Sequence, residues 1–267
     1  MWWFLKWCDL EDMTDQQTVL PSMRVDGQVA LVTGAGRGIG RGCALALAEA
    51  GAEVIAMSRT ESEIAEVVAE IEAMGRCARA IPCDITDQDA VTAAFEGIER
   101  LDILVNNAGT SVPMGFLKAD AETLDLMLNL NVRAAFLVAQ AAARIMDCHG
   151  GGVIIHLSST FGKVGRPGFS IYSGTKHFID GLTKSTAVEL APRNIRVVAV
   201  GPTAIATPMM KDRLADPEVA AELTSRIPMG RIGKIEDVVG AVVFLASPAA
   251  ALITGTTIMV DGGWTAP

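Results

Sequence analysis

The chain contains a single tyrosine, Tyr172, and a lysine, Lys176, follows it four positions later. Residues 172–182 have the apolar spacing of a helix, in which positions i and i+4 share a face. A phenol ordinarily loses its proton near pH ~10, too high for a base in the cell. An ammonium about 4 Å away, at an effective dielectric of ~20, would contribute about 4 kcal/mol, or roughly 3 pK units. The pair therefore predicts a tyrosine whose pKa is lowered toward neutrality, where general acid–base catalysis is most effective.

A glycine-rich turn, Thr33 to Gly40, lies between a predicted strand over residues 29–33 and a predicted helix over residues 41–50. The glycines allow the backbone to approach a pyrophosphate. The N-terminus of the following helix supplies free N–H groups and a partial positive charge. A strand, a turn of this kind and a helix in succession predict a dinucleotide-binding site.

The end of the second predicted strand indicates which dinucleotide binds. An NAD site usually carries an acidic residue about 20 positions after the turn, where it binds the ribose 2′-hydroxyl. Here Ser58 and Arg59 stand at that place, and Arg37 in the turn adds a second cation. Because arginine suits a 2′-phosphate, the sequence predicts NADP(H) as the preferred cofactor, with NAD(H) possible.

Short apolar runs alternate with longer helical patterns along most of the chain. The predicted strands are mostly continuous apolar runs, as in strands covered on both faces; they are residues 29–33, 53–58, 78–81, 103–106, 153–157, 196–200 and 257–260. Ile64, Val67 and Ile71 mark one face of a helix, and Thr60 with Glu63 predicts a capping box at its start. The alternation predicts an α/β fold with a doubly wound parallel sheet, helices on both faces, and ligands beyond the carboxyl ends of the strands.

The composition disfavours several classes of partner. Lys and Arg number 22 against 31 Asp and Glu, so the net charge of −9 disfavours nucleic acid and anionic membrane surfaces. Five scattered cysteines without a Cys-x-x-Cys pair predict reduced thiols and a cytoplasmic protein. The three histidines lack zinc-ligand spacing, so no metal site is predicted.

Two apolar segments need separate interpretation. Residues 238–260 carry no charge and are long enough to span a bilayer. Ser247-Pro248 in their middle instead predicts a buried helix followed by a buried strand. At the N-terminus, a short apolar run is followed by acidic residues and shows no secretory cleavage site. We therefore predict a disordered extension over residues 1–24, or a true start at Met13 or Met23, and one domain over residues 25–267.

Further motifs follow in order along the chain. Asp84 comes after the third strand, Asn106-Asn107-Ala108-Gly109 after the fourth, and Asn131 lies within Asn-Leu-Asn-Val. Ser159 lies 13 residues before Tyr172. Together with the glycine turn, these motifs resemble the short-chain dehydrogenase/reductase family over nearly all of residues 27–264.

The resemblance implies a Rossmann fold with seven parallel strands in the order 3-2-1-4-5-6-7. It also implies a homotetramer whose interfaces are helices over residues 121–147 and 173–190. The cofactor-binding residues that it implies are Gly34, Gly36, Arg37, Gly38, Ile39, Ser58, Arg59, Asp84, Ile85, Asn107, Tyr172, Lys176, Ile205 and Thr207.

The activity implied by the resemblance is an NADP(H)-dependent interconversion of a ketone and a secondary alcohol by hydride transfer. The implied catalytic residues are Asn131, Ser159, Tyr172 and Lys176. Ser159 and Tyr172 would hydrogen-bond the substrate oxygen, with Tyr172 as general acid in reduction and general base in oxidation. Lys176 would lower the pKa of Tyr172 and hold the nicotinamide ribose, and Asn131 would anchor a water that relays protons.

One residue near the expected substrate pocket departs from the family pattern, and the other residues there do not identify the substrate. Thr203 stands where the family usually has glycine, so the loop beside the nicotinamide is expected to run differently. The surrounding loops carry Met and Phe and few charges, which predicts an apolar pocket for a neutral ketone or secondary alcohol. Trp264 is expected to reach the pocket of a neighbouring subunit.

Three alternative functions stay open. A 3-oxoacyl-[acyl-carrier-protein] reductase would need a basic docking surface, for which the sequence offers Lys163 and Arg166. A sugar or polyol dehydrogenase would use the same catalytic residues. A cofactor-sensing protein without catalysis would have the fold alone, but Ser159, Tyr172 and Lys176 are all present.

Overall fold

The computed structural model describes residues 19–266, so most of the extension predicted over residues 1–24 lies outside the described residues. Seven strands form one sheet in the order β3-β2-β1-β4-β5-β6-β7, and every pairing is parallel. The predicted Rossmann topology is therefore confirmed. The strands are β1 (Val29–Thr33), β2 (Glu53–Ser58), β3 (Ala78–Pro82), β4 (Ile103–Asn106), β5 (Gly152–Leu157), β6 (Ile195–Pro202) and β7 (Thr257–Val260).

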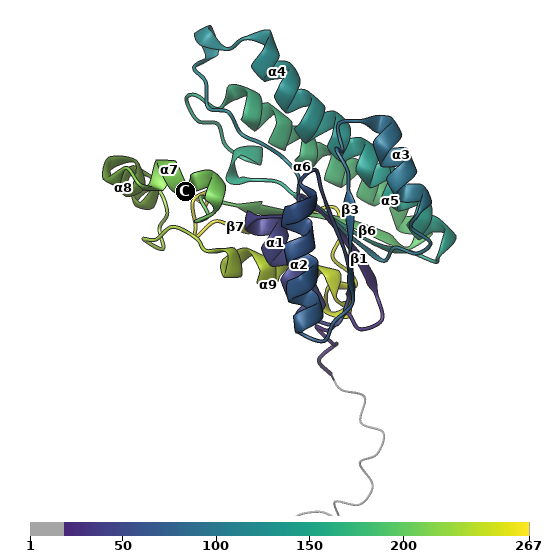
Figure 1. Ribbon diagram of the computed structural model, residues 1–267. Coiled ribbons are helices and arrows are strands. Elements are labelled where there is room, and N and C mark those ends of the chain that lie inside the picture. Colours follow the sequence, from purple (N-terminus) through teal and green to yellow (C-terminus); the bar gives the residue numbers. More distant parts are fainter. Residues whose placement is uncertain (1–18, 267) are drawn as a thin grey trace, which may run out of the picture.

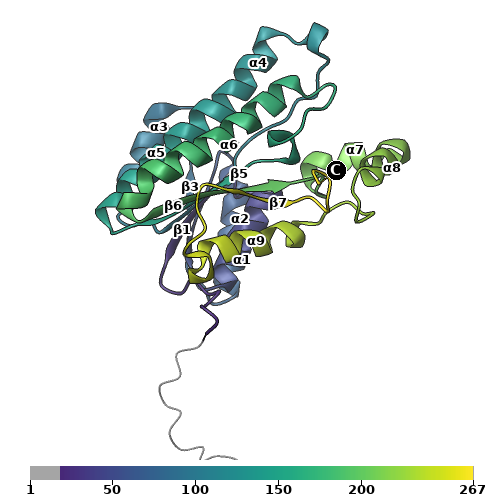
Figure 2. The same ribbon diagram turned by 180° about the vertical axis from the view of Figure 1, so that it is seen from behind.

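Helices cover both faces of the sheet, as Figures 1 and 2 show. One face carries α1 (Gly38–Glu49), α2 (Glu61–Ala73) and α9 (Ile235–Ala246). The other carries α3 (Gln88–Glu96), α4 (Ala121–Leu128), α5 (Ala135–Cys148) and α6 (Ser170–Leu190). Two short helices, α7 (Lys211–Leu214) and α8 (Pro217–Ser225), lie apart from both layers, beyond the end of β6.

The sheet separates two hydrophobic cores. Successive side chains of a strand point to opposite faces, so Val32 of β1 packs in the core with α1 and α9, whereas Leu31 packs in the core with α3 and α5. Both side chains are fully buried. Because both faces of the central strands are covered, their sequences are continuous apolar runs, which is why the strands could be located to within two residues.

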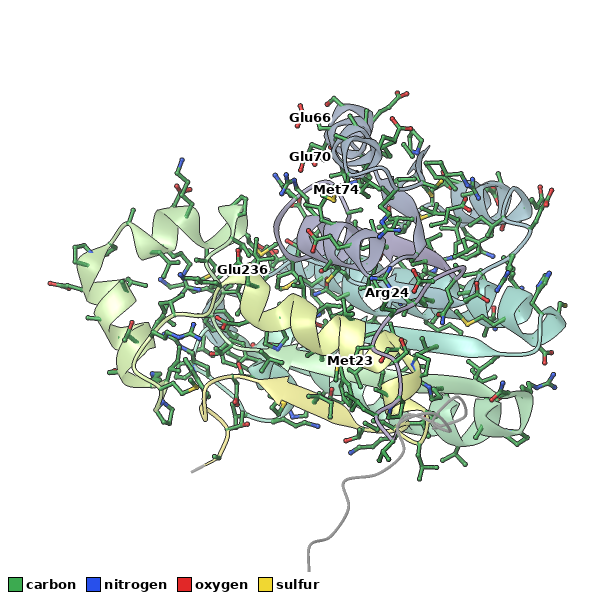
Figure 3. All side chains as sticks on the ribbon, turned by 90° about the horizontal axis from the view of Figure 1, so that it is seen from below. Met23, Arg24, Glu66, Glu70, Met74 and Glu236 are labelled. Carbon is green, nitrogen blue, oxygen red and sulfur yellow. The ribbon has the colours of Figure 1, made fainter. Side chains whose placement is uncertain are left out.

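The start of α2 differs from the prediction. Thr60 is the N-cap residue but its side chain makes no capping hydrogen bond, so the predicted capping box is wrong. Glu63 instead lies against the glycine turn: a Cβ built on Gly36 would come within 2.6 Å of its carboxylate. Farther along α2, Glu66 and Glu70 point away from the sheet (Figure 3).

The uncharged segment over residues 238–260 has the structure that the sequence predicts, and a second apolar run lies elsewhere in the chain. Residues 238–260 contain the end of α9, which stops at Ala246 before Ser247-Pro248, and then β7, as predicted. Among the described helices, the continuous run Ala121–Cys148 of α4 and α5 is long and apolar enough to cross a membrane by length and composition. A core helix can pass the same test, and Val138 and Met146 of this run are fully buried against the sheet.

Candidate active site

A cavity of about 360 Å³ lies at the carboxyl ends of the strands, within the ~300–1,000 Å³ range of small-molecule sites. Its lining combines the glycine turn, the ends of β2 and β5, the N-terminal turn of α6, the loop after β6 and α7. All of the predicted site residues line this cavity except Asn131. Packing therefore brings together residues that are as far apart in sequence as Gly34 and Thr207.

The glycine turn has the geometry of an anion-binding loop. Gly34 and Gly38 have φ angles of +64° and +58°, which side chains with a Cβ rarely adopt. A Cβ on Gly40 would lie 2.1 Å from the carbonyl oxygen of Gly34, so α1 can begin this close to β1 only with glycine there. The N-cap residue Arg37 provides no side-chain cap, which leaves the first N–H groups of α1 available to a pyrophosphate.

Thr33, which the sequence reasoning missed, holds this turn against the loop after β4. Its hydroxyl accepts hydrogen bonds from the backbone N–H groups of Asn107 and Ala108 at 3.0 and 3.1 Å. The Asn107 side chain in turn donates to the carbonyl oxygen of Thr33 at 2.9 Å. The polar residue at the end of an otherwise apolar strand was the signal that could have identified it.

The end of the cavity predicted to bind the adenosine ribose contains charges of both signs. Arg37 and Arg59 line it, but so do the carboxylates of Glu63 and Asp84. Arg59 is 70% exposed, with a guanidinium nitrogen 3.9 Å from a carboxylate oxygen of Asp84. Burial acts to raise the pKa of Asp84, but hydrogen bonds from Thr86 and the charge of Arg59 outweigh it and lower that pKa. The two arginines therefore face two carboxylates, which the sequence reasoning had not anticipated.

Tyr172 and Lys176 lie on one face of α6, as their spacing predicted. The Lys176 ammonium nitrogen lies 5.6 Å from the centre of the Tyr172 ring and donates a hydrogen bond to the backbone oxygen of Leu157 at 2.6 Å. Burial raises the pKa of Tyr172 to about 12, although the Ser159 hydroxyl acts to lower it. The prediction of a lowered pKa is therefore wrong for the chain alone, because the ammonium is directed to Leu157 and desolvation of the phenolate outweighs it.

Lys176 is itself deeply buried, at 7% exposure. Burial lowers its pKa to about 8, while the negative charge of Asp180 acts in the opposite direction. Asp180 lies one further helical turn along α6, so Tyr172, Lys176 and Asp180 follow one another at four-residue intervals on the same face.

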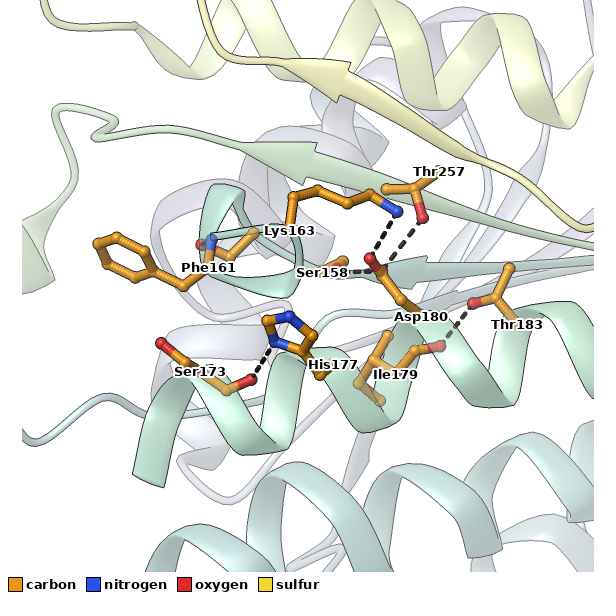
Figure 4. Close-up of polar contacts among 10 residues, drawn as sticks. Ser158, Phe161, Lys163, Ser173, His177, Ile179, Asp180, Thr183 and Thr257 are labelled. Atoms are coloured by element: carbon orange, nitrogen blue, oxygen red, sulfur yellow. Dashed lines mark hydrogen bonds and ion pairs between the residues drawn. The ribbon is translucent and has the colours of Figure 1, made fainter. Parts of the chain in front are cut away.

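Asp180 is the centre of a buried polar network, shown in Figure 4. One carboxylate oxygen accepts hydrogen bonds from the hydroxyls of Ser158 at 2.7 Å and Thr257 at 3.1 Å. The other lies 2.7 Å from the Lys163 ammonium, an ion pair without hydrogen-bond geometry. The network ties α6 to β7 and to the loop after β5 that carries Ser159. The sequence reasoning missed Asp180, although an acidic residue one turn after Lys176 on the same helix face was visible.

Ser159 and Asn131 occupy different surroundings. Ser159 is 8% exposed, lines the cavity and accepts a hydrogen bond from the N–H of Phe161 at 3.2 Å. Asn131 lies in a π-helical turn, Asn129–Ala134, between α4 and α5. Its amide bonds both the N–H and the carbonyl oxygen of Thr110, at 2.9 and 2.8 Å, and donates to Thr175. The side chain thus connects the loop after β4 to α6, and its role in proton relay stays a prediction.

The opposite end of the cavity contains a cluster of aromatic rings around the phenol. The ring centre of Phe161 lies 6.1 Å from that of Tyr172 and 6.4 Å from that of Trp264. Phe169 lies 4.9 Å from Phe161 and 6.5 Å from Tyr172. The indole of Trp264 therefore lines the pocket of its own chain. Its contact with a neighbouring subunit stays a prediction.

Charged residues also line this end of the cavity. The guanidinium carbons of Arg166 and Arg213 each lie 5.5 Å from the centre of the Phe169 ring, and both arginines line the cavity. The prediction of few charges near Tyr172 is therefore wrong. Arg213 comes from α7, in the segment after β6, and only the folded chain shows that its side chain lines the cavity.

The predicted basic patch is also altered by the fold. Lys163 pairs with the buried Asp180, and Arg166, whose side chain is only 13% exposed, pairs with Glu222 at 2.5 Å. Both cations are thus engaged within the chain, which weakens the case for docking an acidic carrier protein at this surface.

Thr203 is accommodated without backbone strain. Among the described residues, Asn194 is the non-glycine residue with a positive φ, so Thr203 does not need the conformation that glycine favours. Its N–H donates to the oxygen of Val260 at 3.2 Å, and the loop continues with a bridge between Ile205 and Gly233. Ile205 and Thr207 still line the cavity.

Within residues 19–266, no group of three His, Cys, Asp or Glu side chains could hold a metal ion. Four described cysteines, Cys43, Cys77, Cys83 and Cys148, are free thiols.

Comparison with known proteins agrees with this geometry. A family model described as enoyl-(acyl carrier protein) reductase matches residues 34–265. L-xylulose reductase from Bos taurus is 40% identical over 245 residues, covering 91% of this chain and 99% of that protein. A protein from Sus scrofa named carbonyl reductase (NADPH) 2 is 39% identical, with the same coverage of 91% and 99%.

Solved structures show the same fold. The crystal structure of a gluconate 5-dehydrogenase from Burkholderia cenocepacia, in complex with NADP and tartrate, matches with a TM-score of 0.89 and 33% identity. The match covers 92% of this chain and 98% of that one. The similarity in sequence and in fold thus extends over nearly the whole length of both proteins.

Proposed function

Since the chain belongs to the short-chain dehydrogenase/reductase family, whose oxidoreductases act on carbonyls and alcohols, we propose that it reduces a ketone to a secondary alcohol with NADPH. One observation carries this proposal. Tyr172, Lys176 and Ser159 line the same cavity as a glycine turn that fits a pyrophosphate. A single ligand-sized cavity therefore contains both a proton donor and a place for a hydride donor.

The roles of the residues follow from their environment. A bound NADPH supplies the hydride to the carbonyl carbon. We assign the hydrogen bonds to the carbonyl oxygen to Ser159 and Tyr172, with Tyr172 delivering the proton. Because burial raises the pKa of Tyr172 to about 12, the phenol is protonated throughout the neutral range and is ready to act as an acid. In oxidation the same residue would act as the base and would need the phenolate form.

Burial lowers the pKa of Lys176 to about 8. We assign its ammonium to the nicotinamide ribose hydroxyls, next to the phenol. Asp180, which raises the pKa of Lys176, helps to retain the charge in a buried position.

The preference for NADP(H) rests on a balance of charges. Arg37 and Arg59 line the adenosine end and support a 2′-phosphate. Asp84 and Glu63 oppose it, but Arg59 is mostly exposed and can turn from Asp84 to the phosphate. The names of two relatives, one with NADPH in its name and one with bound NADP, also support this assignment.

The decisive experiment is the substitution Tyr172→Phe, which keeps the aromatic ring and removes the proton donor. We expect turnover of a ketone to fall by about 10²–10⁴-fold, with the dissociation constant for NADPH, followed by fluorescence, within about twofold of the wild-type value. Undiminished turnover with intact NADPH binding would refute the proposed role. NADPH binding without turnover by the wild-type protein across a broad carbonyl panel would favour the cofactor-sensing alternative.

A sugar or polyol substrate is the second candidate. It is favoured by the names of the relatives, L-xylulose reductase and gluconate 5-dehydrogenase. Initial rates with a simple diketone, a ketose and an acetoacetyl thioester separate this candidate from the general carbonyl reductase and from the 3-oxoacyl-carrier reductase.

We also propose a cytoplasmic homotetramer. Exposed apolar side chains along α4, α5 and α6 support an interface on these helices; they are Leu124, Leu126, Leu128, Phe136, Phe178 and Val188. Light scattering coupled to size-exclusion chromatography tests this directly, and a monomer at micromolar concentration would contradict it.

A further inference from the structure

The charge of the cavity beyond Tyr172 is opposite to that of the whole protein. The chain carries a net charge of −9, yet the described acidic residues that line the cavity are Glu63 and Asp84, both at the adenosine end. At the other end, the charged lining residues are Arg166 and Arg213. A protein rich in carboxylates thus presents only cations to the part of the cavity beside the reacting phenol.

Both guanidinium groups are held close to the phenol by an aromatic ring. Each guanidinium carbon lies 5.5 Å from the centre of Phe169, and that ring lies 6.5 Å from the ring of Tyr172. The cations are therefore one aromatic ring away from the proton donor. A ligand that contacts both Tyr172 and a guanidinium must therefore extend past the Phe169 ring.

The two arginines differ in how their charges are satisfied. Arg166 is nearly buried and donates to Glu222 at 2.5 Å, and Glu222 also accepts from Arg226 at 2.7 Å. Arg213 has no ion pair or side-chain hydrogen bond with any residue between 19 and 266; its described contact is the face of Phe169. The face of an aromatic ring attracts a cation but cannot accept the five N–H donors of a guanidinium in their own plane.

We propose that this end of the cavity binds the carboxylate of an oxo acid or hydroxy acid, with Arg213 as its partner. The inference rests on the proposed function, in which the ketone of the same molecule is reduced at Tyr172. A planar guanidinium pairs with a carboxylate through two parallel hydrogen bonds, a geometry that Phe169 leaves free. Arg166, which is paired with Glu222, also contacts the Phe169 ring. Its charge adds to the positive potential at this end of the cavity.

The experiment compares oxo acids with their methyl esters, which differ in charge but share the ketone. Suitable pairs are 3-oxobutanoate, 4-oxopentanoate and 5-oxohexanoate with the corresponding esters, which vary the distance between ketone and carboxylate. For at least one length, we expect kcat/KM for the acid to exceed that for the ester by about tenfold or more. In Arg213→Met this ratio should fall close to one, and in Arg213→Lys it should stay intermediate.

Lys211→Met provides the matched control, because it removes one positive charge from the exposed neighbouring position on α7. It should leave the acid-to-ester ratio unchanged. An equal ratio for all pairs in the wild-type protein, or a preference that persists in Arg213→Met, would overturn the inference. A loss of NADPH affinity in Arg213→Met with an unchanged ratio would assign Arg213 to the cofactor instead.

Failure of the proposed function would look different from failure of this inference. If the proposed function is wrong, neither the oxo acids, nor their esters, nor a neutral diketone would oxidise NADPH. If the esters and the diketone are reduced without any advantage for the acids, the reductase assignment stands and the carboxylate site is refuted.

Discussion

Replacing Asp180 with asparagine tests the network beneath the candidate active site. Ser158 and Thr257 donate to the same carboxylate oxygen, so an asparagine oxygen can keep both hydrogen bonds. The loss is the ion pair with Lys163 at 2.7 Å, where the new amide would place a donor against a donor. Removing one partner of a buried ion pair costs about 3–5 kcal/mol.

The loss of stability expected for Asp180→Asn is smaller than about 3–5 kcal/mol, because Lys163 is 33% exposed and can turn toward water. We therefore expect about 2 kcal/mol of lost stability, or a fall in Tm of roughly 4–8 °C for a chain of this size. Thermal unfolding at fixed protein concentration, followed by circular dichroism, measures it.

A double-mutant cycle isolates the pair. Lys163→Met leaves the Asp180 carboxylate without its cation, whereas the double variant removes both charges together. The double variant should be less destabilised than the sum of the single variants by at least about 1 kcal/mol. Additivity to within about 0.5 kcal/mol would refute the view that Lys163 and Asp180 stabilise each other in the folded chain.

The single variant Asp180→Asn has a second consequence, which a purely structural role of Asp180 would not produce. The charge of Asp180 raises the pKa of Lys176, which burial otherwise lowers to about 8. Without that charge, Lys176 should lose its proton at lower pH. The decline of kcat/KM on the alkaline side should therefore move to lower pH in Asp180→Asn, whereas a general loss of folded enzyme would lower the profile equally at every pH.

Two further predictions concern His156 and Arg59. Burial lowers the pKa of His156 from 6.5 to about 4. The contribution of the neutral, buried His156 to the stability of the fold is therefore complete above pH 6.5 and is lost as the pH falls to about 4. The free energy of unfolding changes by up to about 3 kcal/mol over this range. His156→Leu should flatten the fall of Tm between pH 7 and 4.5, and parallel curves for the two proteins would contradict this. Arg59→Ser should weaken NADPH binding about tenfold and change NADH binding less than twofold. Fluorescence titration measures both affinities. Equal losses for the two dinucleotides would show that Arg59 does not contact a 2′-phosphate.

Features that depend on local sequence were predictable. The strands were located because strands covered on both faces must be apolar at successive positions, as in Val29–Thr33 and Ile103–Asn106. The glycine turn was recognised because only glycine allows its backbone angles and the close contact at Gly40. Tyr172 and Lys176 were placed on one face of a helix by their spacing alone.

Features that depend on contacts between distant segments were decided by the tertiary structure. The sequence contains Ser158, Lys163 and Asp180, but only the packing of α6 against the loop after β5 makes them a network. Arg213 lines the cavity only because the fold brings α7, beyond the end of β6, next to it. The direction of the Tyr172 pKa shift was reversed for the same reason. Spacing determines which side chains share a face, whereas burial and competing partners, which arise only in the folded chain, determine how charges behave there.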